Sequence, residues 1–213
     1  MWCCRLASGR RNEAMDADPA LEQPPIRLLV GLQNPGREYE DTRHNAGVWA
    51  LRRFADAHGA TLKPEAKFES EVGRVQGPGT DLRLAAPLTY MNASGRAVAA
   101  LTRFFKIAPN EVLVMHDDLD LPPGTARLKL GGGSGGNNGL KDCIKALGTP
   151  DFMRARIGIG HPGDRSKVVD YVLSAPSRAD RSAIDDAIER LLSVLDDAIG
   201  GRAARAMNEL HKG

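Results

Sequence analysis

The stretch Ile-Arg-Leu-Leu-Val-Gly-Leu-Gln-Asn-Pro-Gly, residues 26–36, decides the fold class of this chain. Its first seven residues form a short apolar run, and the Asn-Pro-Gly that follows marks a turn, which together indicate a buried strand ending in a loop. Residues 46–58 then carry apolar side chains at helical spacing, and Gly59 is placed to end that helix. A buried strand followed by an amphipathic helix predicts the repeating unit of an α/β sheet.

The same alternation continues to the end of the chain. Further strands are expected at residues 72–75, 82–86, 111–115, 126–130 and 155–159, and further helices at 94–106, 139–147 and 184–199. The turn signal Gly77-Pro78-Gly79 separates the first two of these strands and predicts a hairpin, which makes the sheet mixed. We therefore predict an α/β fold: a single-domain three-layer sandwich with a mixed, mostly parallel β-sheet flanked by helices.

Length and composition are those of one compact folded unit. The 213 residues suit a single domain, and shares of 42% hydrophobic and 26% charged residues argue against intrinsic disorder and a coiled-coil rod. No apolar run approaches the roughly 18 residues that a membrane-spanning helix needs, so neither membrane insertion nor secretion is expected. Residues 1–25 lack periodicity and include a second methionine, Met15, and we expect a flexible extension or a misassigned start there. The folded domain is then expected at residues 26–213.

Cysteine usage and charge limit the class of protein further. The three cysteines are Cys3, Cys4 and Cys143, and no Cys or His cluster has zinc-ligand spacing, so neither a disulfide framework nor a metal site is expected. A reducing cytoplasm fits this usage. The net charge of +2 is unevenly spread, because basic residues predominate between residues 27 and 167 and acidic ones after residue 170. This distribution favours a polyanionic partner for the middle of the chain.

A glycine tract at residues 131–136 matches two known patterns. Gly131, Gly133 and Gly136 have G-x-G-x-x-G spacing, but the acidic residue about 20 positions on, Asp151, precedes the next strand instead of ending it. A phosphate-binding Walker loop also fails, because no Gly-Lys-Ser/Thr follows. Glycines let a backbone approach a ligand closely and let its N–H groups face an anion, although a flexible surface loop has the same composition.

The tract also contains a formal nucleophile elbow. Residues 132–136 read Gly-Gly-Ser-Gly-Gly, which would make Ser134 a nucleophile of the G-x-S-x-G type. A triad in the order Ser, Asp, His would then need residues such as Asp151 and His161. Too little chain separates these residues to hold the strands that normally lie between them, so the elbow is a minor alternative.

Polar residues gather where predicted strands end or helices begin. Asn34 follows the first strand, His44 and Asn45 precede the first helix, and Asn92 and Asp117 occupy similar positions farther along. Such strand ends can converge on one crevice in an α/β sheet. A lone histidine at a helix start is more often a cap or a surface residue, so it is the combination that indicates a site.

Six segments identify a family that the chain resembles. Residues 34–36, 42–47, 89–95, 116–124, 131–142 and 156–162 resemble, in order and spacing, the bacterial-type peptidyl-tRNA hydrolases. The likeness runs from about residue 26 to the C-terminal helix. It implies a monomeric, single-domain enzyme without a metal or organic cofactor. The reaction implied is hydrolysis of the ester that joins a peptide to the 3′ ribose of tRNA, which recycles the tRNA.

The resemblance also implies roles for individual residues. His44 would be the general base for water, and Asp117 would accept a hydrogen bond from the other imidazole nitrogen. Asn92 would donate to the water or to the developing oxyanion. The remaining substrate-binding residues implied are Asn34, Tyr39, Met91 and Asn138, which would hold the peptide near the ester. Amide side chains suit this task because backbone amides are common to every peptide.

The tRNA side of the substrate is assigned to basic residues. By resemblance, Lys129 and Arg156 clamp the 5′ phosphate of the acceptor stem, and Lys141 extends this surface together with Lys145. Asn137 belongs to the same set, although it departs from the family, which usually has histidine there. Ser134 also stands where many members have another residue. We predict retained hydrolysis with altered substrate affinity.

Two other functions remain open at this point. The fold also occurs in factors that assist RNA splicing, so a non-catalytic RNA-binding relative is the main alternative. A generic esterase that uses Ser134 is the other. The presence of His44, Asp117 and Asn92 together favours the peptidyl-tRNA hydrolase.

Overall fold

A computed structural model of the chain describes residues 23–77 and 80–212. Nearly all of the extension expected at residues 1–25 lies outside these residues. Cys3, Cys4 and Met15 therefore also lie outside them, as does the tip of the expected hairpin turn at residues 78–79. None of the described helices combines the length and the apolar character that are needed to cross a membrane.

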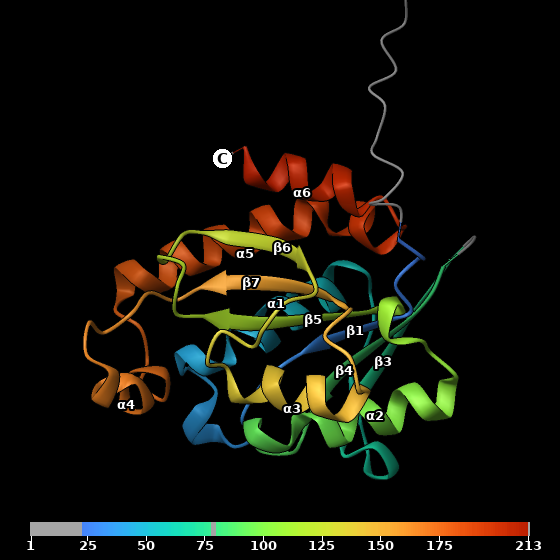
Figure 1. Cartoon of the computed structure of the whole chain (residues 1–213), viewed down its shortest axis with the longest axis horizontal. Coiled ribbons are helices and arrows are strands. Elements are labelled where there is room, and N and C mark those ends of the chain that lie inside the picture. Colours follow the sequence, from blue (N-terminus) through green and yellow to red (C-terminus); the bar gives the residue numbers. More distant parts are fainter. Residues whose placement is uncertain (1–22, 78–79, 213) are drawn as a thin grey trace, which may run out of the picture.

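The described chain forms a seven-stranded mixed sheet with the order β2-β3-β4-β1-β5-β7-β6 (Figure 1). Its strands are β1 (Leu28–Gly31), β2 (Lys63–Glu65), β3 (Ser70–Gly77), β4 (Thr80–Pro87), β5 (Val112–Asp118), β6 (Ala126–Leu130) and β7 (Met153–Gly158). Strands β4, β1, β5 and β7 run parallel in the centre, whereas β2, β3 and β4 pair antiparallel, as do β6 and β7. The α/β class, the mixed sheet and the β3–β4 hairpin pairing are confirmed. The sheet is not mostly parallel as predicted, because three of its six strand pairs are antiparallel.

Helices cover both faces of the sheet and complete three layers (Figure 1). They are α1 (Ala46–Ala57), α2 (Ser94–Phe105), α3 (Asn138–Leu147), α4 (Val168–Val172), α5 (Arg178–Ile199) and α6 (Ala203–His211). Leu29 packs into the core under α1, α5 and α6, while its neighbours Leu28 and Val30 pack under α2 and α3. This alternation follows from the two-residue period of a strand. Because both faces are covered, the central strands are apolar throughout, as the first stretch of sequence indicated.

One strand and two helices of the structure were not predicted from the sequence. Strand β2 is three exposed residues at the sheet edge, α4 has only five residues, and α6 follows α5 after a short turn. Helix α5 also begins before residue 184, because the Ser177 hydroxyl caps it by accepting from the Asp180 N–H at 3.1 Å. Short or exposed elements carry too few apolar residues for a periodic pattern.

Close backbone packing fixes the position of α1 on the sheet. A Cβ atom added to Gly47 would collide with the Met115 carbonyl oxygen of β5. The Leu32 N–H donates to that same oxygen at 3.0 Å, and the Val48 N–H donates to the Leu32 carbonyl at 3.2 Å. The first turn of α1 therefore lies directly against the carboxyl ends of β1 and β5, at the end of the sheet where the candidate site residues lie.

Candidate active site

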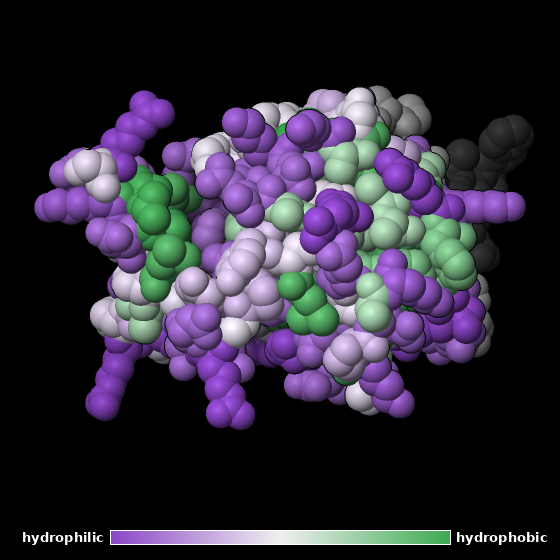
Figure 2. Space-filling view, turned by 90° about the horizontal axis from the view of Figure 1, so that it is seen from below, coloured by the Kyte–Doolittle hydropathy of each residue, from purple (hydrophilic) through white to green (hydrophobic). Residues whose placement is uncertain are grey.

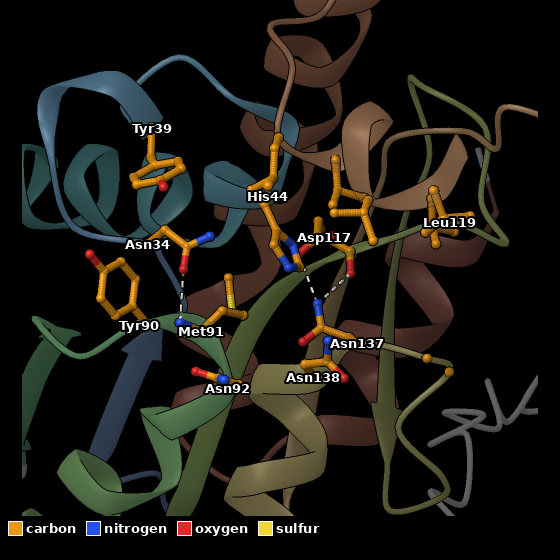
Figure 3. Close-up of a pocket in the computed structure, with 16 residues that line it drawn as sticks. Asn34, Tyr39, His44, Tyr90, Met91, Asn92, Asp117, Leu119, Asn137 and Asn138 are labelled. Carbon is orange, nitrogen blue, oxygen red and sulfur yellow. Dashed lines mark hydrogen bonds and ion pairs between the residues drawn. The ribbon is translucent and has the colours of Figure 1, made fainter. Parts of the chain in front are cut away.

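His44 and Asp117 form a buried pair at this end of the sheet (Figure 3). His44 lies in the 3-10 turn Arg43–Asn45 that leads into α1, and Asp117 lies near the end of β5. Asp117 Oδ1 is 2.9 Å from His44 Nδ1, and the two side chains are 3% and 11% exposed. An ionised carboxylate only accepts hydrogen bonds, so Nδ1 carries the proton and the lone pair of a neutral imidazole lies on Nε2. His44 Nε2 bonds to no other described residue and is available to a ligand.

Burial and charge act on the pKa of His44 in opposite directions. Burial lowers the pKa, whereas the charge of Asp117 and its hydrogen bond raise it, and the net result is a pKa above the ordinary value of 6.5. The pair therefore makes His44 a stronger base than a free imidazole. A neutral His44 that gains a proton would be stabilised as the cation by Asp117, as the acid of a catalytic triad stabilises its histidine.

A hydrogen bond holds the side-chain amide of Asn34 through its oxygen, whereas its nitrogen bonds to no other residue that the structure describes. Its backbone N–H donates to Asn45 Oδ1 at 2.8 Å, and Asn45 Nδ2 returns a bond to the Asn34 carbonyl at 3.1 Å. Asn34 Oδ1 accepts from the Met91 N–H at 2.8 Å. The oxygen is therefore occupied, and Nδ2 points toward His44 in Figure 3. A fixed donor beside the imidazole suits a carbonyl or oxyanion acceptor.

Two further amides face the same cavity, which has a volume of about 380 Å³. Asn92, in the 3-10 turn before α2, and Asn138, at the start of α3, both line it and are exposed. Neither side chain bonds to another described residue, so both can bind a ligand. Met91 is buried in the cavity wall and Tyr39 is half-buried at its edge. The structure thus brings together in one cavity the residues for which the sequence predicted catalytic and peptide-binding roles.

The apolar wall of this cavity was not predicted from the sequence. Val168, Val169, Val172 and Leu173 of α4 and the residue after it line one side. Val169 is 65% exposed, and Tyr90 in the same cavity is 62% exposed. Figure 2 shows the apolar patch over α4 at the left of the molecule. The paired valines and Leu173 have helical spacing and could have signalled this wall, but five residues are too few for a confident pattern.

Arg43 joins this wall to the turn that carries His44. Its Nη1 atom donates to Ser174 Oγ at 2.8 Å and to the Ala175 carbonyl at 2.9 Å. The guanidinium also lies 4.1 Å from the centre of the Tyr171 ring, in cation–π geometry. The segment that follows α4 is therefore held against the residue next to the base. This anchoring role for Arg43 was not foreseen.

The two residues expected to clamp a phosphate line a separate, smaller cavity. Lys129 on β6 and Arg156 on β7 both border a space of about 170 Å³ beside the glycine tract. Arg156 Nε donates to Asp118 Oδ2 at 2.6 Å, which leaves its other nitrogens for a ligand. Lys141 is exposed on α3 and does not line this cavity. The structure therefore groups Lys129 with Arg156 and leaves Lys141 apart.

Asn137 lies apart from Lys129 and Arg156, with which it was predicted to contact tRNA. It was grouped with the tRNA contacts, but it is only 8% exposed and lines the cavity that holds His44. Its Nδ2 atom donates to Asp117 Oδ1 at 2.8 Å, and its Oδ1 atom accepts from the Leu140 N–H at 3.0 Å. Both ends of the amide are hydrogen-bonded within the protein, and Asn137 does not line the cavity of Lys129 and Arg156.

Ser134, the serine of the possible nucleophile elbow, is not hydrogen-bonded to a histidine among the described residues. It borders the smaller cavity with Lys129. His161 Nδ1 accepts from the Gly163 N–H at 2.9 Å instead. A serine nucleophile requires an adjacent base, so this alternative is not supported.

Within the described residues, no three His, Cys, Asp or Glu side chains gather as metal ligands would. Cys143 is a fully buried residue of α3, and burial raises the pKa of its thiol to about 12. Such a thiol packs as an apolar side chain and offers no thiolate for chemistry.

Comparison with known proteins adds three findings. A family model described as peptidyl-tRNA hydrolase matches residues 28–213. Curated peptidyl-tRNA hydrolases from Edwardsiella ictaluri and from a serogroup A strain of Neisseria meningitidis are 54% and 53% identical to this chain, covering 87% of it and 95% and 97% of their own lengths. The crystal structure of peptidyl-tRNA hydrolase from Acinetobacter baumannii is 46% identical, with a TM-score of 0.84 over 87% of this chain and 94% of that one.

Proposed function

The chain belongs to the peptidyl-tRNA hydrolase family, and from this membership we propose that it hydrolyses the ester between a peptide and the 3′ ribose of tRNA. The observation that carries the proposal is the bond of 2.9 Å between Asp117 and His44. It leaves Nε2 of the base available beside a cavity that the amides of Asn34, Asn92 and Asn138 line. The products are a peptide with a free carboxyl group and a tRNA that can be charged again.

Hydrolysis by this pair needs one water and no covalent intermediate. His44 Nε2 takes a proton from the water while its oxygen adds to the ester carbonyl carbon. The resulting oxyanion accepts hydrogen bonds from amide N–H groups, for which Asn92 is the proposed donor and Asn34 Nδ2 a second. Collapse of the tetrahedral species breaks the bond to the ribose 3′ oxygen. That oxygen takes the proton held by His44, which restores the neutral base.

The cavity suits a peptide of variable sequence. The amides of Asn34 and Asn138 would bind backbone groups, which every peptide has, and Tyr39 and Met91 would border the chain. The side chains of α4 that line the cavity are valines, which offer an apolar surface without directional groups, so side chains of many shapes can pack there. This division between polar and apolar walls supports binding of the peptide through its backbone.

We further propose that residues 26–213 form the catalytic domain and that a single chain suffices, since His44 and Asp117 come from the same chain. The substrate occurs where translation takes place, which assigns the activity to the cytoplasm. The acceptor stem would lie across Lys129 and Arg156, with the exposed Lys141 beside it.

The phosphate clamp makes a specific prediction. Lys129→Ala and Arg156→Ala should each raise KM about tenfold for a substrate that carries a 5′ phosphate, because each loses a charge-assisted contact. The same variants should change KM little for a substrate without that phosphate. Steady-state kinetics on the two substrates measures both effects. Lys63→Ala, which removes an exposed lysine at the opposite edge of the sheet, is the matched control. Equal effects on both substrates would remove the clamp from the proposal.

Single-turnover cleavage of a blocked aminoacyl-tRNA tests the function itself. The parent protein should release the blocked amino acid. Ser134→Ala should retain the rate within about twofold, because Ser134 lines the smaller cavity and not the one that holds His44. An inactive parent would favour the non-catalytic RNA-binding relative. A large loss in the serine variant would instead favour the nucleophile elbow.

A further inference from the structure

Asn137 has an orientation that its surroundings determine. It is the N-cap of α3, with extended backbone angles, and its Oδ1 atom accepts from the Leu140 N–H at 3.0 Å. An N-cap must present an acceptor to the helix, so the amide oxygen faces α3. The nitrogen then points away from the helix, toward β5. There Asn137 Nδ2 lies 2.8 Å from Asp117 Oδ1, as the dashed line in Figure 3 marks.

Asp117 Oδ1 thus receives two donors. His44 Nδ1 approaches it at 2.9 Å and Asn137 Nδ2 at 2.8 Å, and the Asp117 side chain is only 3% exposed. Little water can replace a donor at such a site. Two donors from different elements, the turn before α1 and the cap of α3, fix the rotation of the carboxylate more tightly than one donor would.

We propose that Asn137 is a positioning residue that holds the Asp117 carboxylate in the orientation from which it directs His44. This inference rests on the proposed function, and it assigns Asn137 to the catalytic pair instead of to the tRNA surface. Its amide adds no charge and does not titrate, so the contact persists over the whole pH range in which His44 works. The N-cap of α3 and the orientation of the base are therefore set by one side chain.

Two variants distinguish the role of Asn137 as the N-cap of α3 from its hydrogen bond to Asp117. Asn137→Ser keeps an oxygen that caps a helix but is too short to reach Asp117, and Asn137→Asp keeps the shape and the cap but replaces the N–H donor with a charged oxygen. Asn137→Ser should lower kcat about tenfold with little change in KM, the loss expected for one charge-assisted hydrogen bond. Asn137→Asp should lower kcat about 100-fold, because two carboxylates then face each other. Asn137→Ser should unfold within a few degrees of the parent. Asn137→Asp should unfold at a lower temperature, because its carboxylate faces Asp117 where both side chains are largely buried.

A control for stability lies at the other end of the same helix. Gly148 ends α3 with φ +75, and a Cβ added there meets no atom within 4 Å. Gly148→Ala therefore strains only the helix end, because φ > 0 is unfavourable for alanine. It should lower the melting temperature while kcat stays at the parent value. A kcat loss in Gly148→Ala like that in Asn137→Ser would reduce Asn137 to a structural role.

A readout independent of turnover is the titration of the His44 imidazole by NMR, with its signals assigned by comparison with His44→Ala. Asn137→Asp should raise the pKa of His44 by about one pH unit, because a second negative charge lies near the ring. An unchanged His44 pKa in this variant would overturn the inference, whether or not the protein cleaves peptidyl-tRNA. A rise in KM alone in Asn137→Ser would also overturn it and return the residue to the tRNA surface. An inactive parent would overturn only the proposed function.

Discussion

Replacement of His44 by alanine is expected to lower the single-turnover rate of peptidyl-tRNA cleavage by about 1,000-fold or more. General base catalysis contributes about 10²-fold to 10⁴-fold, and in this site the base also returns the proton to the leaving oxygen. Binding should change little, because the amides of Asn34, Asn92 and Asn138 and the wall of α4 remain. Rapid-quench kinetics at saturating enzyme measures the rate, and a binding titration measures the affinity.

The matched control for that variant is His58→Ala. His58 lies just after the last turn of α1, the helix whose first turn follows His44, and it stacks on Phe54 far from the cavity. Its replacement removes the same functional group and should leave the cleavage rate unchanged. A His44→Ala protein that cleaves at a tenth of the parent rate or faster would exclude His44 as the base.

Asp117→Asn is expected to lower kcat by about 100-fold to 10,000-fold, the second largest effect. An amide can donate to His44 Nδ1, which would move the imidazole proton to Nε2 and remove the lone pair that accepts the proton of water. The new side chain also supplies no charge to stabilise the imidazolium. Asp151→Asn, on an exposed loop, is the control and should retain the parent rate.

The pH profile of kcat/KM gives a second test of the same pair. His44 must be neutral to act as a base, so activity falls as the pH drops through its pKa, which in the parent lies above 6.5. Burial lowers this pKa, and the charge and hydrogen bond of Asp117 raise it. Asp117→Asn removes both raising contributions and leaves burial, so the acid limb of its residual activity should move to lower pH. An acid limb at the parent position would show that another group titrates.

Much of the fold was predictable because its central elements carry strong patterns. The apolar run at residues 26–32 meets a turn signal, which indicates a buried strand, and its residues 28–31 form β1 at the centre of the sheet. Helix α4 could not be predicted in this way. It has five residues, and it is held in place by Arg43, a residue more than a hundred positions earlier in the chain. Such an element owes its position to tertiary contacts, which a local pattern does not contain.

The site was partly predictable for the same reason. Asn34 and Asp117 lie at the carboxyl ends of parallel strands, and His44 precedes the helix that packs on them, so the sheet brings them together. Asn137 was different. Its place before a helix signals an N-cap, but its bond to Asp117 depends on which way the amide turns. Contacts with α3 and β5 together fix the orientation of this amide, and those contacts form only in the folded protein.

The close contact between Gly47 and the Met115 carbonyl affects how the protein loses activity on heating. It joins the backbone of the helix after His44 to the backbone of β5, the strand that carries Asp117, so no side-chain rearrangement can lengthen it. The backbones that carry His44 and Asp117 can separate only if α1 leaves the sheet, and that movement opens the core. Thermal inactivation should therefore coincide with melting of the domain and not precede it.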